Sequence, residues 1–469
     1  MKIAFIHYHL KTGGVTTVLS QQIKAIQNSC DTFVLTGSDQ KPSFPVDSVF
    51  IPGLGYDSLA TKKPPPHQVA ESIINAISEK FGSPCDALHV HNPILAKNAD
   101  FLKILSELQK RKIKLFLQVH DFAEDGRPNL YFLDQYLPDC HYGVINSRDY
   151  DILLKAGLKK EGLHKIFNMI EPFCLTNRAK YIDNIVLYPI RAIRRKNIGE
   201  AILVSLYFKS REKLSITLPP NSPADFGSYK GWKNFVAHNN INVEFESGLK
   251  NEFSQLVLSS RFMITTSISE GFGFSFVEPW SAQKLIWGRK LPEICRDFEK
   301  NGINLDHLYS KLVVPLEWIE KNKFYQKWSG CILEICKRLH YDIDKPSIEK
   351  IFSQMVAKET IDFALLDEPF QKAIISQVMS SRKEKNVLIR LNPYLASVGM
   401  VTDKQRLIQH NMKAVLSNYS KQIYKQKLLQ IYKKVMCVSV SQRIDKKILL
   451  SCFIDPRHFS LLKWCEYSE

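Results

Sequence analysis

The chain has 469 residues, too many for one ordinary hydrophobic core, so we expect two or three domains. Its 45% hydrophobic and 24% charged residues are those of a soluble globular protein with a formal charge of +17. No apolar run approaches the ~18–20 residues of a membrane-spanning helix, and the N-terminal stretch lacks a secretory signal pattern. The ten cysteines include no Cys-x-x-Cys pair, so we expect reduced thiols in a cytoplasmic protein.

Short apolar runs alternate with helix-length segments along the first part of the chain. This alternation is typical of β-α-β units stacked around a parallel sheet. It predicts a Rossmann-like N-terminal domain over residues 1–175. The expected strands are Ile3–Tyr8, Thr32–Leu35, Ala87–Val90, Lys114–Val119 and Tyr142–Ile145.

A second series of apolar runs begins near Asn184 with IVLYPI and continues to RFMITTSI. Pro172 and the polar stretch TNRAKYIDN between the two series indicate a linker. We therefore predict a second Rossmann-like domain over residues 176–403. Within it, a segment at about 322–400 is rich in helix signals, and we expect no sheet of its own in Asp342 to Met400.

The last part of the chain is basic and helical in pattern. Residues 404–436 carry apolar side chains at the spacing of one or two amphipathic helices that need a surface to cover. Residues 1–175 hold 19 Lys and Arg against 18 Asp and Glu, whereas residues 370–469 hold 18 against 6. Such a tail can contact phosphates, an anionic membrane or nucleic acid, or simply decorate solvated helices.

The stretch ITTSISEGFGFSFVEPWSAQ places Glu270 and Glu278 on either side of a glycine-rich turn. We expect a strand over residues 262–269 and a helix that begins near Phe274. Ligands of open parallel sheets bind beyond the carboxyl ends of strands, where glycines and the positive end of a helix suit a diphosphate. Taken alone, the two acids also fit an ordinary helix N-terminus. The turn itself consists of Gly271, Phe272 and Gly273.

Three motifs together resemble the retaining, family-4-like glycosyltransferases (glycosyl transferases group 1) of the GT-B fold. The first is the Glu-(seven residues)-Glu spacing with Gly-Phe-Gly after the first glutamate. The second motif is YPIRAIRRKNIGEAI, in which Arg191 and Lys196 lie five residues apart. The guanidinium fork of the arginine and the point charge of the lysine suit a diphosphate. In the first half, KTGGVTTVL resembles the family's glycine loop with Gly13 and Gly14, and LFLQVHDFAEDG places His120 after a strand, where the family carries a histidine.

This resemblance covers roughly residues 1–300 and the last helices. It implies the GT-B fold, in which two Rossmann-like α/β domains face a cleft and the helices of residues 404–469 pack back towards the first domain. It also implies a retaining hexosyltransferase that moves a sugar from a nucleotide diphosphate sugar to an acceptor. The implied mechanism is front-face and needs neither a metal ion nor another cofactor.

The resemblance further implies roles for individual residues. Glu270 would hold hydroxyls of the donor sugar, and His120 would position this sugar and stabilise its oxocarbenium-like state. Glu278 would hold the ribose of the nucleotide. The donor diphosphate would be bound by Arg191, Lys196, Gly271, Phe272, Gly273, Gly13 and Gly14.

Some residues of the first half have weaker signals. Asp121 and Asn146 follow strands and are candidate acceptor contacts, with a solvated loop as the alternative for Asp121. His89 and His91, together with His120 and Asp121, have the residue types of a metal site, but the resemblance implies no metal.

The chain also departs from the family pattern. Ile190 stands before Arg191 where the family usually has glycine, and the segment after the second glutamate is altered. The helix-rich segment at about 322–400 is an addition. The sequence therefore does not define the donor base, the sugar or the acceptor, which can be a carbohydrate, a small molecule, a protein or a lipid-linked group.

Two other classes of function stay open. One is a GT-B epimerase or phosphorylase, although the phosphorylase needs a pyridoxal lysine motif that the chain lacks. The other is a catalytically silent GT-B module whose basic tail binds an anionic membrane or nucleic acid. The chain has no recognisable nucleic-acid reader fold, which disfavours nucleic acid. An acceptor at the inner face of a membrane remains compatible with a cytoplasmic enzyme.

Overall fold

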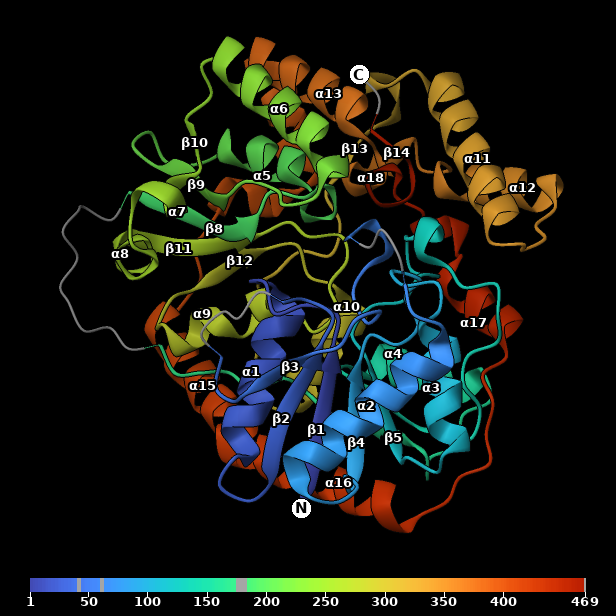
Figure 1. Cartoon of the computed structure of the whole chain (residues 1–469). Helices are drawn as coiled ribbons and strands as arrows, with labels where there is room; N and C mark the ends of the chain where they lie inside the picture. The colour runs from blue at the N-terminus through green and yellow to red at the C-terminus, as the bar shows by residue number, and fades with distance from the viewer. Residues whose placement is uncertain (40–43, 60–62, 174–183, 468–469) are drawn as a thin grey trace. The chain divides into compact units, whose positions relative to one another are not determined.

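The computed structural model describes residues 1–39, 44–59, 63–173 and 184–467 (Figure 1). The chain forms two compact units, and each is made of two separate stretches. Unit 1 consists of Met1–Met169 and Tyr419–Ile454, and unit 2 consists of Ile170–Asn418 and Asp455–Glu469. The resemblance implies that the last helices pack against the first domain. The stretch Tyr419–Ile454 belongs to unit 1, whereas the residues on either side of it belong to unit 2.

Unit 1 is built on a parallel sheet in which the described strands follow the order β3-β2-β1-β4-β5-β6-β7. All five strands predicted for this half are present. The other two, β3 and β7, have three residues each, too few to stand out as apolar runs. The bounds are β1 Lys2–His7, β2 Asp31–Thr36, β3 Ser48–Phe50, β4 Ala87–His91, β5 Leu115–Val119, β6 His141–Val144 and β7 Leu163–Lys165.

Helices cover both faces of this sheet, which explains why its strands are apolar along their whole length. Successive side chains of a strand point to opposite faces, so Ile3 and Phe5 of β1 join one hydrophobic cluster, and Ala4 and Ile6 join another. The face of Phe5 is covered by α1 (Gly14–Ile26) and α16 (Lys421–Cys437), which pack side by side. The other face carries α2 (Pro66–Phe81), α3 (Phe101–Lys110), α4 (Ser147–Lys155) and α17 (Lys446–Phe453).

Unit 2 has a second parallel sheet, whose described strands follow the order β10-β9-β8-β11-β12. The strands are β8 Ile185–Arg191, β9 Lys213–Leu218, β10 Val243–Phe245, β11 Ser260–Thr265 and β12 Ile286–Gly288. The helices between and beside them are α5 Ile198–Ser205, α6 Pro223–His238, α7 Ser247–Lys250, α8 Phe253–Ser259, α9 Glu278–Ser281, α10 Pro292–Lys300 and α15 Lys404–Asn418. Two Rossmann-like sheets in one chain confirm the predicted fold class.

The segment at about 322–400, which the structure describes throughout, is rich in helices and has no sheet of its own, as predicted, but it contributes one strand to a two-stranded sheet. Its strand β14 (Thr360–Asp362) pairs antiparallel with β13 (Val313–Pro315). These three-residue strands are too short to give an alternating pattern. The helices are α11 Lys321–Arg338, α12 Lys345–Met355, α13 Glu368–Ser380 and α14 Arg382–Leu391. Across the described residues, no helix combines the length and the apolar character that a membrane span requires.

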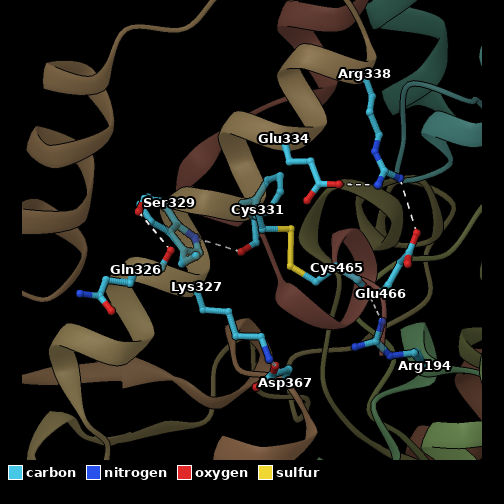
Figure 2. Close-up of a disulfide and its surroundings, with 12 residues drawn as sticks. Arg194, Gln326, Lys327, Ser329, Cys331, Glu334, Arg338, Asp367, Cys465 and Glu466 are labelled. Carbon is cyan, nitrogen blue, oxygen red and sulfur yellow. Dashed lines mark hydrogen bonds and ion pairs between the residues drawn. A yellow bond between two sulfur atoms is a disulfide. The ribbon is translucent and has the colours of Figure 1, made fainter. Parts of the chain in front are cut away.

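The end of the chain is tied to unit 2 by a disulfide. Cys331 of α11 is bonded to Cys465, which follows the short helix α18 (Leu461–Trp464), and their Cα atoms are 6.1 Å apart (Figure 2). The expectation of reduced thiols is therefore wrong for this pair. The two cysteines are 134 residues apart, and no local spacing rule connects residues at such a distance.

Candidate functional site

Unit 2 brings a lysine, an arginine and a glutamate together where two neighbouring parallel strands end. After β8, the chain forms the 3-10 turn η3 (Arg194–Lys196), and after β11 it runs to Glu270. The Lys196 ammonium donates a hydrogen bond to Oε1 of Glu270, and the side chains of the pair are only 13% and 9% exposed. Nη1 of Arg195 lies 3.9 Å from Oε2 of the same carboxylate. We call Arg195, Lys196 and Glu270 the cation loop cluster.

The charges of this cluster depend on one another. Burial acts to raise the pKa of Glu270, but the cations of Lys196 and Arg195 outweigh it and hold this pKa below its ordinary value. Burial lowers the pKa of Lys196, the Glu270 carboxylate opposes that shift, and Arg195 adds to it. Because the carboxylate stays ionised, the pair is an ion pair in a largely dry environment.

Hydrogen bonds fix the backbone that carries this cluster. The Tyr188 hydroxyl of β8 donates to the carbonyl oxygen of Lys196 at 2.6 Å, and it accepts from the Thr266 N–H at 3.1 Å. The Thr266 hydroxyl also donates to the Lys196 carbonyl oxygen, at 3.1 Å. Tyr188 therefore links the exit of β8 to the exit of β11, and this link positions Lys196 opposite Glu270.

The three consecutive cations of η3 and the predicted Arg191 have different surroundings. Arg191 is the last residue of β8, and its half-buried guanidinium has no ion-pair partner among the described residues. Arg194 instead makes two hydrogen bonds to the buried Glu368, of 2.7 and 2.8 Å, and another to the Cys465 carbonyl oxygen (Figure 2). Sequence reasoning missed Arg195, for which the run Arg-Arg-Lys is the available signal.

The Gly-Phe-Gly turn contributes backbone rather than side chains. Gly273 has φ +89°, a left-handed conformation that favours glycine, and a Cβ there would meet Ile294 and Phe276 at 3.0 Å. Phe272 is 4% exposed and packs its ring against Phe298, with 5.5 Å between the ring centres. Gly271 is half-buried. Any ligand contact of this turn therefore uses its amide groups.

The helix expected to begin near Phe274 is wrong in its extent. The chain forms the 3-10 turn Phe274–Phe276 and then the four-residue helix α9, and Val277 between them has φ −124° and ψ −38°. Pro279 cannot donate a backbone hydrogen bond to continue a helix. The expected strand over 262–269 likewise ends at Thr265. The helix-dipole argument for a diphosphate is correspondingly weaker here.

Glu278 is the first residue of α9 and lies at the surface. Neighbouring protein atoms desolvate its carboxylate, and the carboxylate of Glu171 repels it; together they raise the pKa of Glu278 to about 7. At neutral pH this carboxyl group is therefore only partly ionised. A ligand that donates hydrogen bonds to it favours the ionised form.

This raised pKa makes a stability prediction. Between the unfolded pKa of about 4.3 and the folded value, the folded state binds more protons, so stability falls as the pH rises through this window. Replacing Glu278 with glutamine removes this penalty. We expect the Glu278→Gln variant to have a higher melting temperature than the parent at pH 8 and the same melting temperature at pH 4.5. The gain in the free energy of unfolding at pH 8 should be less than ~1 kcal/mol, because the group is exposed. The measurement is thermal unfolding at both pH values. Glu171→Gln should give a smaller effect of the same sign, and an equal shift at both pH values would contradict the assignment.

In unit 1, His120 follows β5 and is 6% exposed. Its Nε2 shares a hydrogen bond of 2.8 Å with Nδ1 of His91, and its backbone N–H donates to the Asn92 side-chain oxygen at 2.7 Å. Burial lowers the pKa of His120 to about 4, against the opposing charge of Asp121. At neutral pH this imidazole is therefore uncharged, and it can act through hydrogen bonding rather than as a cation.

The other predicted residues of unit 1 lie at the same edge of the sheet. Asp121 receives a 2.8 Å hydrogen bond from Arg127. Asn146 caps α4, because its side-chain oxygen accepts from the Asp149 N–H at 2.7 Å. Gly13 precedes α1 with extended backbone, and a Cβ on Gly14 would meet nothing within 4 Å. Packing within the chain thus does not require glycine at position 14, which leaves room for a ligand to approach the backbone.

The histidines of this sheet form hydrogen bonds with one another and with polar side chains. His89 bonds the Tyr432 hydroxyl at 2.9 Å and the Gln118 side chain at 2.8 Å. In the part of the chain that the structure describes, no group of three or more His, Cys, Asp or Glu side chains is arranged to hold a metal ion.

Comparison with known proteins finds one curated relative along most of the chain. The chain is 28% identical over 412 residues to the mannosylglucosyl-3-phosphoglycerate synthase of Petrotoga mobilis, a match that covers 78% of this chain and 79% of that protein. No protein-family model matches the chain.

Solved structures of low sequence identity share the fold. A glycosyltransferase from Rickettsia africae has a TM-score of 0.53 at 12% identity, over 93% of this chain and 98% of that one. The sucrose-phosphate synthase of Thermosynechococcus elongatus gives 0.52 at 13% identity, over 92% and 98%. Anabaena HepE in complex with UDP-glucose gives 0.52 at 12% identity, over 92% and 99%. These findings confirm the GT-B fold and the predicted resemblance to glycosyltransferases.

Proposed function

We propose that this chain, which has the GT-B fold and is similar to a mannosylglucosyl-3-phosphoglycerate synthase, is a retaining glycosyltransferase that uses a nucleotide diphosphate sugar. The observation that carries the proposal is the cation loop cluster at the ends of β8 and β11, where open α/β sheets bind ligands. The Petrotoga enzyme's name supports a small-molecule acceptor, and the HepE complex supports a nucleotide sugar donor.

In the proposed reaction, unit 2 binds the donor. Arg191 brings a guanidinium fork to the diphosphate, Lys196 brings a point charge, and Arg195 adds a third cation. Glu270, already held ionised, accepts hydrogen bonds from the sugar hydroxyls. Glu278 accepts them from the ribose once it is ionised. Backbone amides of Gly271, Phe272 and Gly273 are the proposed diphosphate contacts of unit 2, and Gly13 and Gly14 of unit 1 stay predicted ligand contacts.

The proposed chemical step retains the anomeric configuration. The bond between the anomeric carbon and the diphosphate oxygen breaks, the acceptor oxygen bonds to this carbon on the same face, and the acceptor proton passes to the leaving diphosphate. Cations fixed before the reaction stabilise the charge that grows on the leaving oxygen, so we propose that no metal ion is needed. Neutral His120 positions the sugar, and Asp121 and Asn146 remain candidate acceptor contacts.

The test is a thermal-shift panel of nucleoside diphosphates and nucleotide sugars, with and without EDTA. A ligand at 100 times its dissociation constant stabilises a protein by about 2.7 kcal/mol, so one base should give a clear rise in melting temperature. NMR of the product formed from the matching donor should show the donor's anomeric configuration. The proposal fails if no nucleoside diphosphate shifts melting, if the product is inverted, or if EDTA abolishes turnover.

A further inference from the structure

Unit 1 has a group of basic side chains at one edge of its sheet. The donor binding proposed for unit 2 gives these side chains no role. Strands β1, β4 and β5 are parallel neighbours, so the segments after them emerge at the same edge. His9 follows β1, Lys97 follows β4 and Arg127 follows β5. Three basic residues from three separate segments therefore meet beyond the carboxyl ends of the strands, the usual ligand position in such sheets.

Tyr56 holds two of these side chains in place. The Lys97 ammonium donates to the Tyr56 hydroxyl at 2.8 Å and lies 4.8 Å from the centre of its ring. Nε2 of His9 bonds the same hydroxyl at 3.0 Å. Arg127 is near enough for its charge to lower the pKa of Lys97, an effect second to that of burial. We call His9, Tyr56, Lys97 and Arg127 the basic edge cluster.

This cluster has more positive charge than its neighbours neutralise. Asp121 is the carboxylate that faces it, and it already binds Arg127 at 2.8 Å. Among the described residues, no carboxylate lies within ion-pair distance of Lys97, although this ammonium is half-buried. The charge of Asp121 reaches Lys97 only beyond ion-pair distance and opposes part of the shift that burial and Arg127 cause in the pKa of Lys97. A partly desolvated cation without an ion-pair partner costs free energy, which an anionic ligand would return.

Unsatisfied polar atoms at the same edge also point to a ligand. Within the described chain, Nδ1 of His9 and Nδ1 of His7 are buried and have no hydrogen-bond partner. His7 is 4% exposed, and its ring centre lies 5.3 Å from that of His9, so the two unbonded atoms belong to neighbouring side chains. Buried polar atoms are normally bonded, and unbonded ones call for a specific explanation.

We infer that the basic edge cluster binds a phosphate group carried by the acceptor, with Lys97 and Arg127 as its counter-charges and His9 as a hydrogen-bonding partner. A dianionic phosphate matches a guanidinium fork and an ammonium better than a single carboxylate does. The inference rests on the proposed glycosyltransferase function and adds to it the substrate class: a small phosphorylated acceptor rather than a neutral sugar.

Direct anion binding tests this site without any donor. Inorganic phosphate and 3-phosphoglycerate should raise the melting temperature of the parent protein at constant ionic strength, whereas glycerol and chloride should not. Lys97→Met and Arg127→Met should each lose this shift. Lys110→Met is the matched control, because Lys110 is an exposed lysine of unit 1 that pairs with Glu107 outside the cluster. A shift that survives in both cluster variants, or vanishes in the control, overturns the inference.

Kinetics then separate the acceptor role from the donor role. With the donor found by thermal shift, the parent should use a sugar phosphate at least 10-fold better than the same sugar without phosphate. Lys97→Met should raise KM for the phosphorylated acceptor roughly 10–100-fold, the loss expected for a charge-assisted hydrogen bond, and Lys97→Arg should restore most of it. KM for the donor should stay unchanged. Equal use of neutral and phosphorylated acceptors, or loss of nucleotide binding in Lys97→Met, refutes the inference and leaves the glycosyltransferase proposal standing. A parent protein that binds no nucleotide refutes that proposal instead.

Discussion

Replacing Lys196 with methionine is expected to lower kcat by about 10²–10³-fold, the loss seen when one preorganised donor to a developing anion is removed. The effect follows from the proposed contact between Lys196 and the leaving diphosphate. Steady-state turnover with the donor identified by thermal shift is the measurement. Lys213→Met is a matched control in unit 2, because Lys213 pairs with Glu244 on neighbouring strands and has a more exposed side chain, at 38%. Unchanged turnover in Lys196→Met would remove the mechanism proposed for unit 2.

The same substitution should also destabilise the fold, and a second variant separates the two effects. Without Lys196, the Glu270 carboxylate stays buried with Arg195 at 3.9 Å as its remaining cation. Removing one partner of a buried ion pair costs about 3–5 kcal/mol, and Arg195 offsets part of this loss. Adding Glu270→Gln removes the charge, so the double variant should recover stability but not turnover. If it recovers turnover as well, the loss in the single variant is a folding defect.

Replacing Arg289 with methionine is expected to reduce the free energy of unfolding by about 3–5 kcal/mol. Its guanidinium, 4% exposed, bonds Glu200 at 2.6 and 2.8 Å and Asp362 at 2.7 and 3.0 Å. Glu200 is fully buried and also accepts a 2.7 Å hydrogen bond from Tyr309. Without Arg289, two carboxylates would remain inside unit 2 with no cation of the described residues within ion-pair distance. Urea unfolding measures the loss.

Arg338→Met is the control for this prediction. Arg338 lies on α11 and pairs with Glu334 one turn away and with Glu466, both at exposed positions, where such pairs contribute at most ~1 kcal/mol each (Figure 2). Arg289→Met combined with Glu200→Gln should recover part of the loss. A loss in Arg289→Met no greater than in Arg338→Met would show that the buried network contributes no net stability.

The sequence predicts the sheets well because their physical signal is local. Strands buried on both faces are short, continuous apolar runs, so Ile3–Tyr8 and Ala87–Val90 stand out without reference to the rest of the chain. The glutamate and lysine motifs are local as well, and the structure pairs Lys196 with Glu270. The predicted helix from Phe274 failed because Val277 and the proline after it interrupt it.

What the sequence could not predict depends on partners that are distant along the chain. Three consecutive cations in a 3-10 turn point in different directions, and their spacing does not say which one faces the glutamate. Arg194 is fixed by Glu368, 174 residues away, and Arg195 is left near Glu270. The Cys331–Cys465 bond and the Arg289 network are likewise set by tertiary packing rather than by motif.

The division of each unit into two stretches has a consequence for synthesis of the protein. The sheet of unit 1 is complete once residue 169 has emerged, but α16, which covers one face of it, belongs to Tyr419–Ile454. At about 5–20 residues per second, the ribosome needs roughly 10–50 s to make the intervening residues. During that interval the apolar face of β1 that includes Phe5 has α1 but not α16, so part of its apolar surface stays exposed until Tyr419–Ile454 has been made.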